Sequence, residues 1–280
     1  MKKIVLPSKS MVLCAACVIS FMFFSGKVFA EQSMAVITVV QNEVLVSTAP
    51  GSAWQKARKG MPCVKNTTIK TGANSYAELV YEDGSGARIE QNSKAVIQNL
   101  NKTDKVNEFI VNLMSGRLLN NVFKKSNKSN KYSVKTPTCV ISVRGTVFVV
   151  DSSSSEAKVA VYEGSVAAEQ PGKGNAGSEI QVKADMQVGI KENEKAAQPK
   201  PLDNEFADYR KNTADLFNKR IEYYRTHMEE VRKMYEDHME AWRKETQGAM
   251  DKNSQDINDT MKEYRKKHGI KEYDTIPDSI

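Results

Sequence analysis

Short runs in which apolar and polar residues alternate fill the chain from about residue 35 to residue 190. The first run, Ala35 to Ser47 (AVITVVQNEVLVS), ends at the turn residues Ala49-Pro50-Gly51. Similar runs rich in Val, Ile, Thr and Tyr return at roughly ten-residue intervals, with Gly, Pro, Asn, Asp and Ser between them. Regular spacing of short strands is typical of an all-β fold. We therefore predict a mainly β domain over residues 31–190, built as a β sandwich or a short β-solenoid.

The pattern changes after residue 190. Residues 191–201 (KENEKAAQPKP) are polar and contain two prolines, which indicates a linker. From residue 202 to residue 280 apolar residues recur in steps of three and four, which predicts an amphipathic helical extension. Its first helix is expected to start near Asp203 and to end before Gly248, with a second segment reaching about His268. The apolar positions of the first helix are Phe206, Tyr209, Phe217, Ile221, Tyr224, Met228, Val231, Tyr235, Met239 and Trp242.

This helical stripe has two interpretations. It can pack on the β domain, on the second segment or on itself, as amphipathic faces usually do. Alternatively, it forms a coiled coil or binds a partner, which allows a homo-oligomer through the C-terminal helices. The heptad from Ile221 to Trp242 is weak, because His238 and Glu245 fall at core positions.

The N-terminus has the pattern of a secretory signal. Basic residues at the start precede an apolar run from Met11 to Phe24, and the small residues Val28 and Ala30 follow. The run is shorter than the ~20 residues that span a bilayer. We therefore expect a signal peptide over residues 1–30, cleaved near Ala30, and a periplasmic or extracellular mature protein without a membrane span. An uncleaved anchor is the alternative.

Charge gives little support for a nucleic-acid partner. The formal net charge of +7 includes four lysines of the signal peptide, so the mature protein is only weakly basic. Local charge is stronger at a turn-rich loop that contains Lys124, Lys125, Lys128 and Lys131. These lysines either lie in solvent or contact anionic envelope polymers or lipid headgroups.

Two cysteines, Cys63 and Cys139, remain after the signal peptide is removed. They either form one disulfide, as exported domains allow, or serve as small buried hydrophobic residues.

The sequence contains no phosphate-binding glycine loop and no cluster of metal ligands. All three histidines lie in the helical extension, at His227, His238 and His268, so a Ser-His or Cys-His pair cannot form within the β domain. We therefore predict no enzymatic activity and no cofactor.

A series of motifs runs through the β region. Its segments are Trp54 to Gly60, Ile69 to Gly72, Ala77 to Ser85, Leu113 to Leu118, Thr136-Pro137, Val143 to Thr146 (VRGT) and Val161 to Val166 (VYEGSV). In this order they resemble the FecR domain family over roughly residues 36 to 170. The framework positions are Gly60, Thr71, Gly72, Asp83, Gly84, Thr136, Pro137, Arg144, Gly145, Thr146, Glu163 and Gly164.

Two of these features lead to further expectations. Arg144 stands between apolar strand positions, where its guanidinium would need polar partners. Asn66-Thr67 stands where the family pattern has a Gly-Asp turn, and Asn tolerates the left-handed backbone that such a turn uses.

The resemblance implies an exported domain, whereas the regulator that names the family is a membrane protein with a cytoplasmic segment that binds a sigma factor. Here nothing precedes the signal peptide, so we expect the exported domain without that role. The predicted function is protein interaction or envelope sensing by a non-catalytic exported protein. The alternatives are an envelope polysaccharide- or polymer-binding module and a helix-mediated oligomeric structural protein. The partner is an unknown protein or an envelope polymer.

Overall fold

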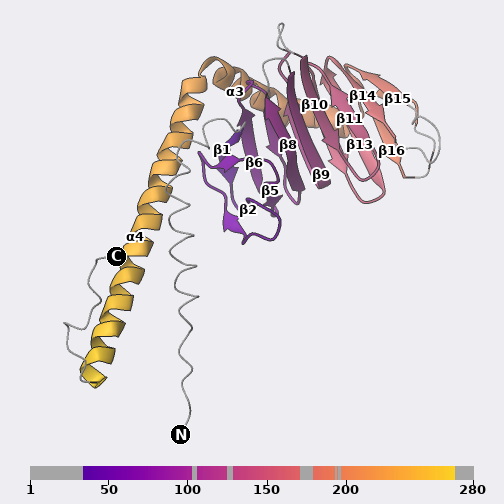
Figure 1. Ribbon diagram of the computed structural model, residues 1–280. Coiled ribbons are helices and arrows are strands. Elements are labelled where there is room, and N and C mark those ends of the chain that lie inside the picture. The colour runs from indigo at the N-terminus through magenta and orange to yellow at the C-terminus, as the bar shows by residue number, and fades with distance from the viewer. Residues whose placement is uncertain are drawn as a thin grey trace.

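The computed structural model describes residues 34–102, 106–124, 129–170, 179–192, 194 and 197–268. The expected signal peptide, Lys125 and Lys128 lie outside these residues. The described chain is mainly β and ends in helices, as predicted (Figure 1). The strands are β1 (Ala35–Gln41), β2 (Val44–Ser47), β3 (Gln55–Lys56), β4 (Pro62–Cys63), β5 (Thr68–Thr71), β6 (Tyr76–Tyr81), β7 (Gly86–Ile89), β8 (Lys94–Lys102), β9 (Val106–Asn121), β10 (Ser129–Lys135), β11 (Val140–Val143), β12 (Val147–Ser152), β13 (Glu156–Glu163), β14 (Ser165–Glu169), β15 (Glu179–Lys183), β16 (Met186–Lys191) and β17 (Lys200–Pro201).

Hydrogen bonds arrange the strands in two layers. Sheet A has the order β4-β1-β6-β7-β9-β12-β13-β16-β17. Sheet B has the order β3-β2-β5-β8-β9-β10-β11-β14-β15. Strand β17 lies inside the expected linker and pairs with the edge of sheet A.

Strand β9 belongs to both sheets. Its first part pairs with β8 and β10 in sheet B, and its last part, Gly116 to Asn121, pairs with β7 and β12 in sheet A. Gly116 stands at the change of sheet with φ +92°, and a Cβ there would lie 2.1 Å from the hydroxyl of Ser93. Only glycine fits this position, so it allows one strand to join the two layers.

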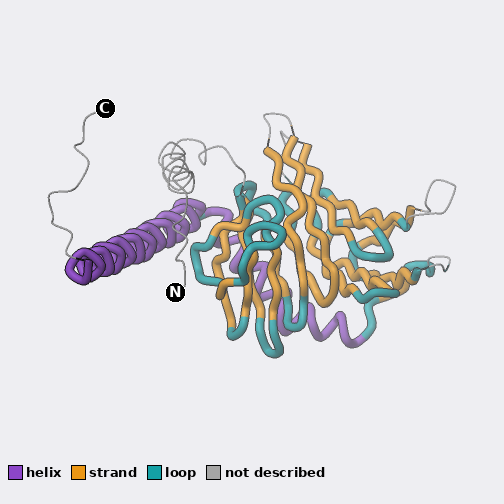
Figure 2. The backbone as a smooth tube through the Cα atoms, turned by 60° about the horizontal axis from the view of Figure 1, so that its bottom comes forward, coloured by secondary structure: helices purple, strands orange, loops and turns teal. Residues whose placement is uncertain are grey.

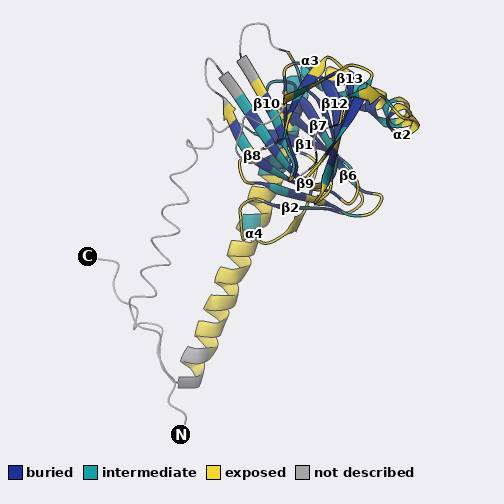
Figure 3. Cartoon of the chain, turned by 90° about the vertical axis from the view of Figure 1, so that its right-hand side faces the viewer, coloured by how far each residue is buried: buried dark blue, intermediate teal, exposed yellow. Residues whose placement is uncertain are grey.

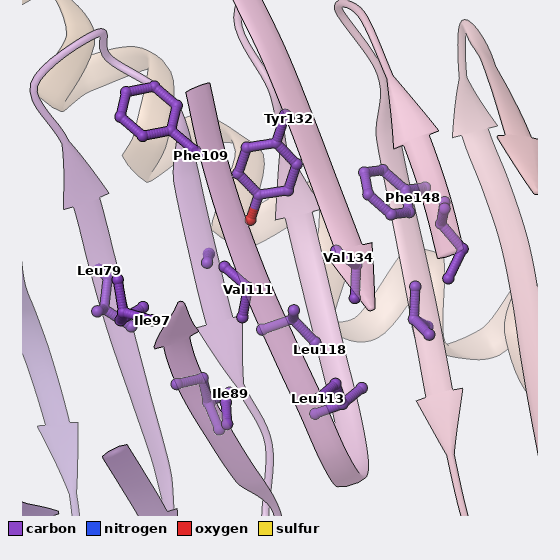
Figure 4. Packing of buried hydrophobic residues seen from close by; sticks show 14 of the residues in the cluster. Leu79, Ile89, Ile97, Phe109, Val111, Leu113, Leu118, Tyr132, Val134 and Phe148 are labelled. Carbon is purple, nitrogen blue, oxygen red and sulfur yellow. The ribbon is translucent and has the colours of Figure 1, made fainter. Parts of the chain in front are cut away.

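The main hydrophobic core fills the space between the sheets (Figure 4). Alternate residues of each strand point inward, as Ile37 and Leu79 do from sheet A and Val111 and Val134 do from sheet B. Aromatic rings connect the layers: the ring of Tyr132 lies 5.9 Å from that of Tyr81 across the core. The Tyr132 hydroxyl donates to Asn120 at 2.7 Å, so its buried polar end has a partner.

The C-terminal region folds into helices α2 (Asn204–Tyr209), α3 (Asp215–Thr226) and α4 (Met228–His268), with a π-helical turn, η2 (Arg210–Ala214), between the first two. Helices α2 and α3 cover the outer face of sheet A, and α4 projects from one end of the β part (Figures 1 and 2). In the part of the chain that the structure describes, no helix is long and apolar enough to cross a membrane.

The predicted helix break at Gly248 is wrong. Helix α4 runs through Gly248, where glycine costs only about 1 kcal/mol relative to alanine. The break lies at His227, which ends α3 with φ −124° and ψ 50° and whose backbone N–H bonds to the carbonyls of Tyr223 and Tyr224. The chain turns there, and α4 sets off in a new direction.

Candidate functional site

A second hydrophobic cluster fixes the helices on sheet A. From the helices it contains Phe206, Ala214, Phe217, Ile221 and Val231, all buried. They pack on the outward-facing residues of β1, β6, β9, β12 and β13. Fully burying a Phe, Ile or Val side chain contributes about 1.5–3 kcal/mol. The prediction that the first helical stripe packs on the β domain therefore holds for α2, α3 and the start of α4.

A buried ion-pair network secures the same junction. The Glu78 side chain on β6 is fully buried, and its carboxylate accepts from Arg88 at 2.8 Å. Arg220 on α3 reaches the same carboxylate through Nε at 2.9 Å and Nη2 at 2.5 Å. A buried carboxylate needs such partners to remain charged. Glu78 therefore connects α3 to sheet A across 142 residues of sequence.

Further polar contacts hold the start of the helical region. Asp203 caps α2 by accepting from the N–H of Phe206 at 3.1 Å, and the Gln187 amide donates to its other oxygen at 2.8 Å. The hydrogen bond from Gln187 lowers the pKa of Asp203. Tyr162 donates its hydroxyl to the carbonyl of Phe206 at 3.0 Å. The helical segment is thus fixed at its first residue and again along α3.

Helix α4, called the arm from here on, rests on the β part only near its start. Val231 is buried in the second cluster, and Gly60 lies under the next turn. A Cβ at Gly60 would lie 2.0 Å from the carbonyl oxygen of Met234, and its φ is +84°. Arg58 reaches Glu245 at 3.0 Å in an exposed ion pair. Gly60 therefore both makes a turn and permits the close approach of the arm.

Beyond these contacts the arm is exposed (Figure 3). The exposed fractions are 52% for Trp242, 47% for Met250, 55% for Ile257 and 47% for Met261. At about 100° per residue they share a sector of roughly 120° with the seated residue Val231. The face that binds the β part thus continues outward, and we call its members the arm stripe: Tyr235, Met239, Trp242, Ala249, Met250, Ile257 and Met261.

A cavity of about 680 Å³ opens where the arm leaves the β part. Met61 and Pro62 line it from the β side, and Met239 and Trp242 line it from the arm. His238 also lies on its wall, and burial, followed by the charge of Arg58, lowers the pKa of this histidine. The cavity has the volume of a typical ligand pocket and a largely apolar lining.

A second cavity of about 680 Å³ lies at the start of α2 and is polar. Its arginine, Arg117, bonds to Asp151 at 2.5 Å and to Glu205, so the charge of this guanidinium is already paired. Lys158 also lines the cavity, but carboxylates, including those of Glu90 and Glu156, outnumber the basic side chains around it. The cavity is therefore a poor site for an anion.

The motif residues act as framework, and several lie beneath the helices. Thr71 accepts from the N–H of Ser93 at 2.9 Å, and Asp83 accepts from that of Ser85 at 2.9 Å. Gly84 accepts from Arg225 on α3 at 3.3 Å. Gly72, Glu163 and Gly164 lie in turns or at strand ends. The chain thus uses Gly60 and Gly84 to bring the helices close to sheet A.

The second half of the motif series closes two turns. The Thr136 hydroxyl accepts from the N–H of Cys139 at 3.0 Å, with exposed Pro137 beside it. Thr146 donates to the carbonyl of Ser165 at 2.9 Å. Arg144 is exposed in the turn beside Gly145, so it needs no buried partners and the expectation of a costly guanidinium is wrong. Asn66 has φ +70°, which confirms the left-handed turn.

The remaining candidates are scattered. Cys63 and Cys139 are buried free thiols, so the structure contains the two small buried residues and not the disulfide. Burial raises the pKa of Cys63 to about 12. Lys124 and Lys131 are exposed at the ends of the basic loop. The exposed aromatic residues among the described residues lie elsewhere, at Trp54, Tyr223 and Trp242.

Sequence reasoning missed the contacts that join distant segments. Glu78 alternates with apolar neighbours like any strand residue, and Arg220 resembles a solvent-facing helix residue. The one available signal was a carboxylate at a position flanked by Ala77 and Leu79, in a strand that is otherwise apolar.

The fold is that of a β framework with an attached helical region. Residues 67–167 match the model of the family described as FecR protein, so this chain contains a FecR domain. No curated protein matches the chain.

Two solved structures are similar, each titled a "putative anti-sigma factor from Parabacteroides distasonis ATCC 8503". The first is 17% identical with a TM-score of 0.43 and covers 52% of this chain and 64% of its own. The second is 16% identical with a TM-score of 0.41 and covers 50% and 62%. This chain thus spans less than two thirds of their length.

Proposed function

We propose that this chain is a non-catalytic, exported FecR-domain protein that acts by protein–protein interaction, with the arm stripe as its contact surface. The β part and helices α2 and α3 form the support that holds the arm. The observation that carries the proposal is the exposed continuation of the seated apolar face along α4.

The exposure is concentrated on one element. Of the eight large hydrophobic side chains exposed among the described residues, four belong to the arm. Scattered exposed apolar residues are normal, but a contiguous apolar surface marks an interaction site. A helix also gains most of its stability by packing an amphipathic face, which the outer half of the arm does not do within the described chain.

The base of the arm is built to orient it. The buried Glu78 carboxylate holds α3, and the close contact at Gly60 holds the first turns of α4. A rigidly held surface loses less conformational entropy on binding than a flexible tail does. This construction supports display of the stripe in a fixed direction.

Export is supported by the N-terminal sequence. The basic start, the apolar run and the small residues before Glu31 follow the secretory pattern. The partner is therefore sought outside the cytoplasm.

Photo-crosslinking in the host cell tests the proposal. A photoreactive amino acid replaces Ile257 in the stripe or, as the matched control, Gln255 on the opposite side of the same turn. We expect a protein adduct from position 257 and at most a faint one from position 255. Absence of an adduct at both positions, or equal adducts at both, would refute the arm stripe as a binding surface.

A further inference from the structure

We propose that the partner of the arm stripe is a second copy of this chain, bound antiparallel along its own arm. The proposal rests on the proposed function and adds the identity of the partner, the direction of pairing and its register. Three features support it: the symmetry of the stripe, the distribution of charge along the arm, and the cavity at its base.

The stripe is nearly symmetric about the peptide between Ala249 and Met250. Turning one arm end over end around that point places Trp242 opposite Ile257 and Met239 opposite Met261, within one residue. A twofold interface requires such a self-complementary surface, because each residue meets its counterpart twice. An arm that binds an unrelated protein has no need for this symmetry.

A short side chain lies at the centre of the pairing. Ala249 of one arm faces Met250 of the other, so a short side chain meets a long one on each side of the point of symmetry. Two helices can approach closely where a hole receives the knob of the facing helix. The crossing point therefore coincides with the point of symmetry.

Charge along the arm favours the antiparallel direction. Residues 228–242 carry five acidic and two basic residues, whereas residues 261–268 carry one acidic and four basic residues. Antiparallel arms bring the acidic start of one against the basic end of the other. Parallel arms would place like charges together, which destabilises a helix pair.

The cavity at the base of the arm receives the end of the partner arm. Met239 and Trp242 line this cavity of about 680 Å³, and they are the residues that face Met261 and Ile257 in the antiparallel register. Lys56 and Arg58 on the β side also line it, and Arg58 is already paired with Glu245 of the same arm. Asp256 of a partner arm precedes Ile257 and has the charge opposite to that of Lys56. The second copy thus fills the cavity with apolar side chains and places a carboxylate near Lys56.

The overall charge of the arm argues against a lipid surface as the occupant. Residues 228–268 carry nine basic and ten acidic residues. Helices that lie on anionic membranes are rich in Lys and Arg on their polar face. A surface with balanced charge and a separation of sign along its length fits another such helix better.

Single-cysteine variants of the purified mature protein, residues 31–280, test the register. Cys63 and Cys139 are buried, so an added cysteine on the arm is the reactive thiol under mild oxidation. Met250→Cys and Ala249→Cys should each form a covalent dimer. Ile257→Cys alone should not, but a mixture of Ile257→Cys with Trp242→Cys should do so. Gln255→Cys is the control on the far side of the arm.

The expected contrast is large. Groups held together have an effective concentration in the millimolar range, so at ~10 µM protein Met250→Cys should crosslink about 100-fold faster than Gln255→Cys. Light scattering of the unmodified protein should give twice the monomer mass. Ile257→Cys that crosslinks with itself as fast as Met250→Cys would indicate parallel arms and overturn the proposal, as would a monomer mass at all concentrations up to ~100 µM.

The outcomes separate this inference from the proposed function. A monomer in solution, together with an in-cell adduct at position 257 to a different protein, would overturn the second copy but keep the arm as a binding surface. A monomer with no adduct would overturn both. Circular dichroism and urea denaturation of each variant establish that it is folded, and Ala249→Cys replaces Met250→Cys if the latter is not.

Discussion

Replacing Glu78 by alanine tests the junction between α3 and sheet A. Breaking a buried ion pair by removing one partner typically costs about 3–5 kcal/mol, because the remaining charge is buried without compensation. Here Arg88 keeps a second carboxylate, Glu90, at 2.5 Å, and Arg220 is 39% exposed, so its guanidinium can recover water. We therefore expect the lower end, a loss of about 3 kcal/mol in the free energy of unfolding.

Urea denaturation followed by circular dichroism measures this loss. With a slope of about 3 kcal/mol per molar for a chain of this size, the midpoint should fall by about 1 M with the slope unchanged. Glu245→Gln is the control, because it removes an exposed ion pair with Arg58 and should cost less than about 1 kcal/mol. If Glu78→Ala unfolds at the same urea concentration as the control, the buried network does not hold the helices and the reasoning is wrong.

Three further predictions concern the base of the arm, the thiols and pH. Gly60→Ala should lower the free energy of unfolding by at least about 2 kcal/mol, because it forces alanine into a left-handed backbone and places a Cβ against the carbonyl of Met234. Gly248→Ala, in open space within α4, should raise the free energy of unfolding by up to about 1 kcal/mol. Urea denaturation measures both changes, and equal effects would contradict the close contact between Gly60 and the arm. Cys63 and Cys139 should not react with a thiol reagent in the folded protein at pH 8, because both are buried and burial raises the pKa of Cys63 to about 12. Both thiols should react after unfolding in guanidinium without reductant. Absence of reaction in guanidinium would indicate a disulfide. Hydrogen bonding lowers the pKa of Asp203 in the folded protein, so the stability that its carboxylate contributes is present above the unfolded pKa near 4 and is lost as pH falls through the folded pKa. Asp203→Asn should keep the helix cap but remove this part of the loss of stability in acid. Urea denaturation at a series of pH values between about 5 and 2 measures the difference.

The fold class was predictable because its signals are local. Alternation within each strand identifies the β region, and the steps of three and four from Phe206 to Val231 identify the helical face that is buried on sheet A. Left-handed turns such as that at Asn66 also follow from residue type alone.

The junction was not predictable because its contacts are between residues far apart in sequence. Glu78 and Arg220 form their ion pair only when α3 lies on sheet A, and the apolar pattern of the sequence does not predict that contact. The turn at His227 was missed because helix propensity points to glycine: Gly248 has the lower propensity, yet α3 ends at His227, whose backbone leaves the helical region.

The surroundings of the arm were predictable only in part, for the same reason. Sequence indicates an amphipathic helix and leaves open whether its stripe is covered. The structure separates the covered start, at Val231, from the exposed remainder beyond Trp242. Residues that share one pattern therefore have two different surroundings.

Amide hydrogen exchange of the mature protein over a range of concentrations tests most directly that the outer arm is a surface for association. In dilute protein, α2, α3 and the first turns of α4 should be protected like the sheets, while residues 243–268 exchange rapidly, since most of the side chains described there are exposed. Raising the concentration to ~100 µM should slow exchange in residues 243–268 and leave the β strands unchanged, because a binding equilibrium protects only the contact surface. Equal exchange of the outer arm at all concentrations would contradict association through this surface.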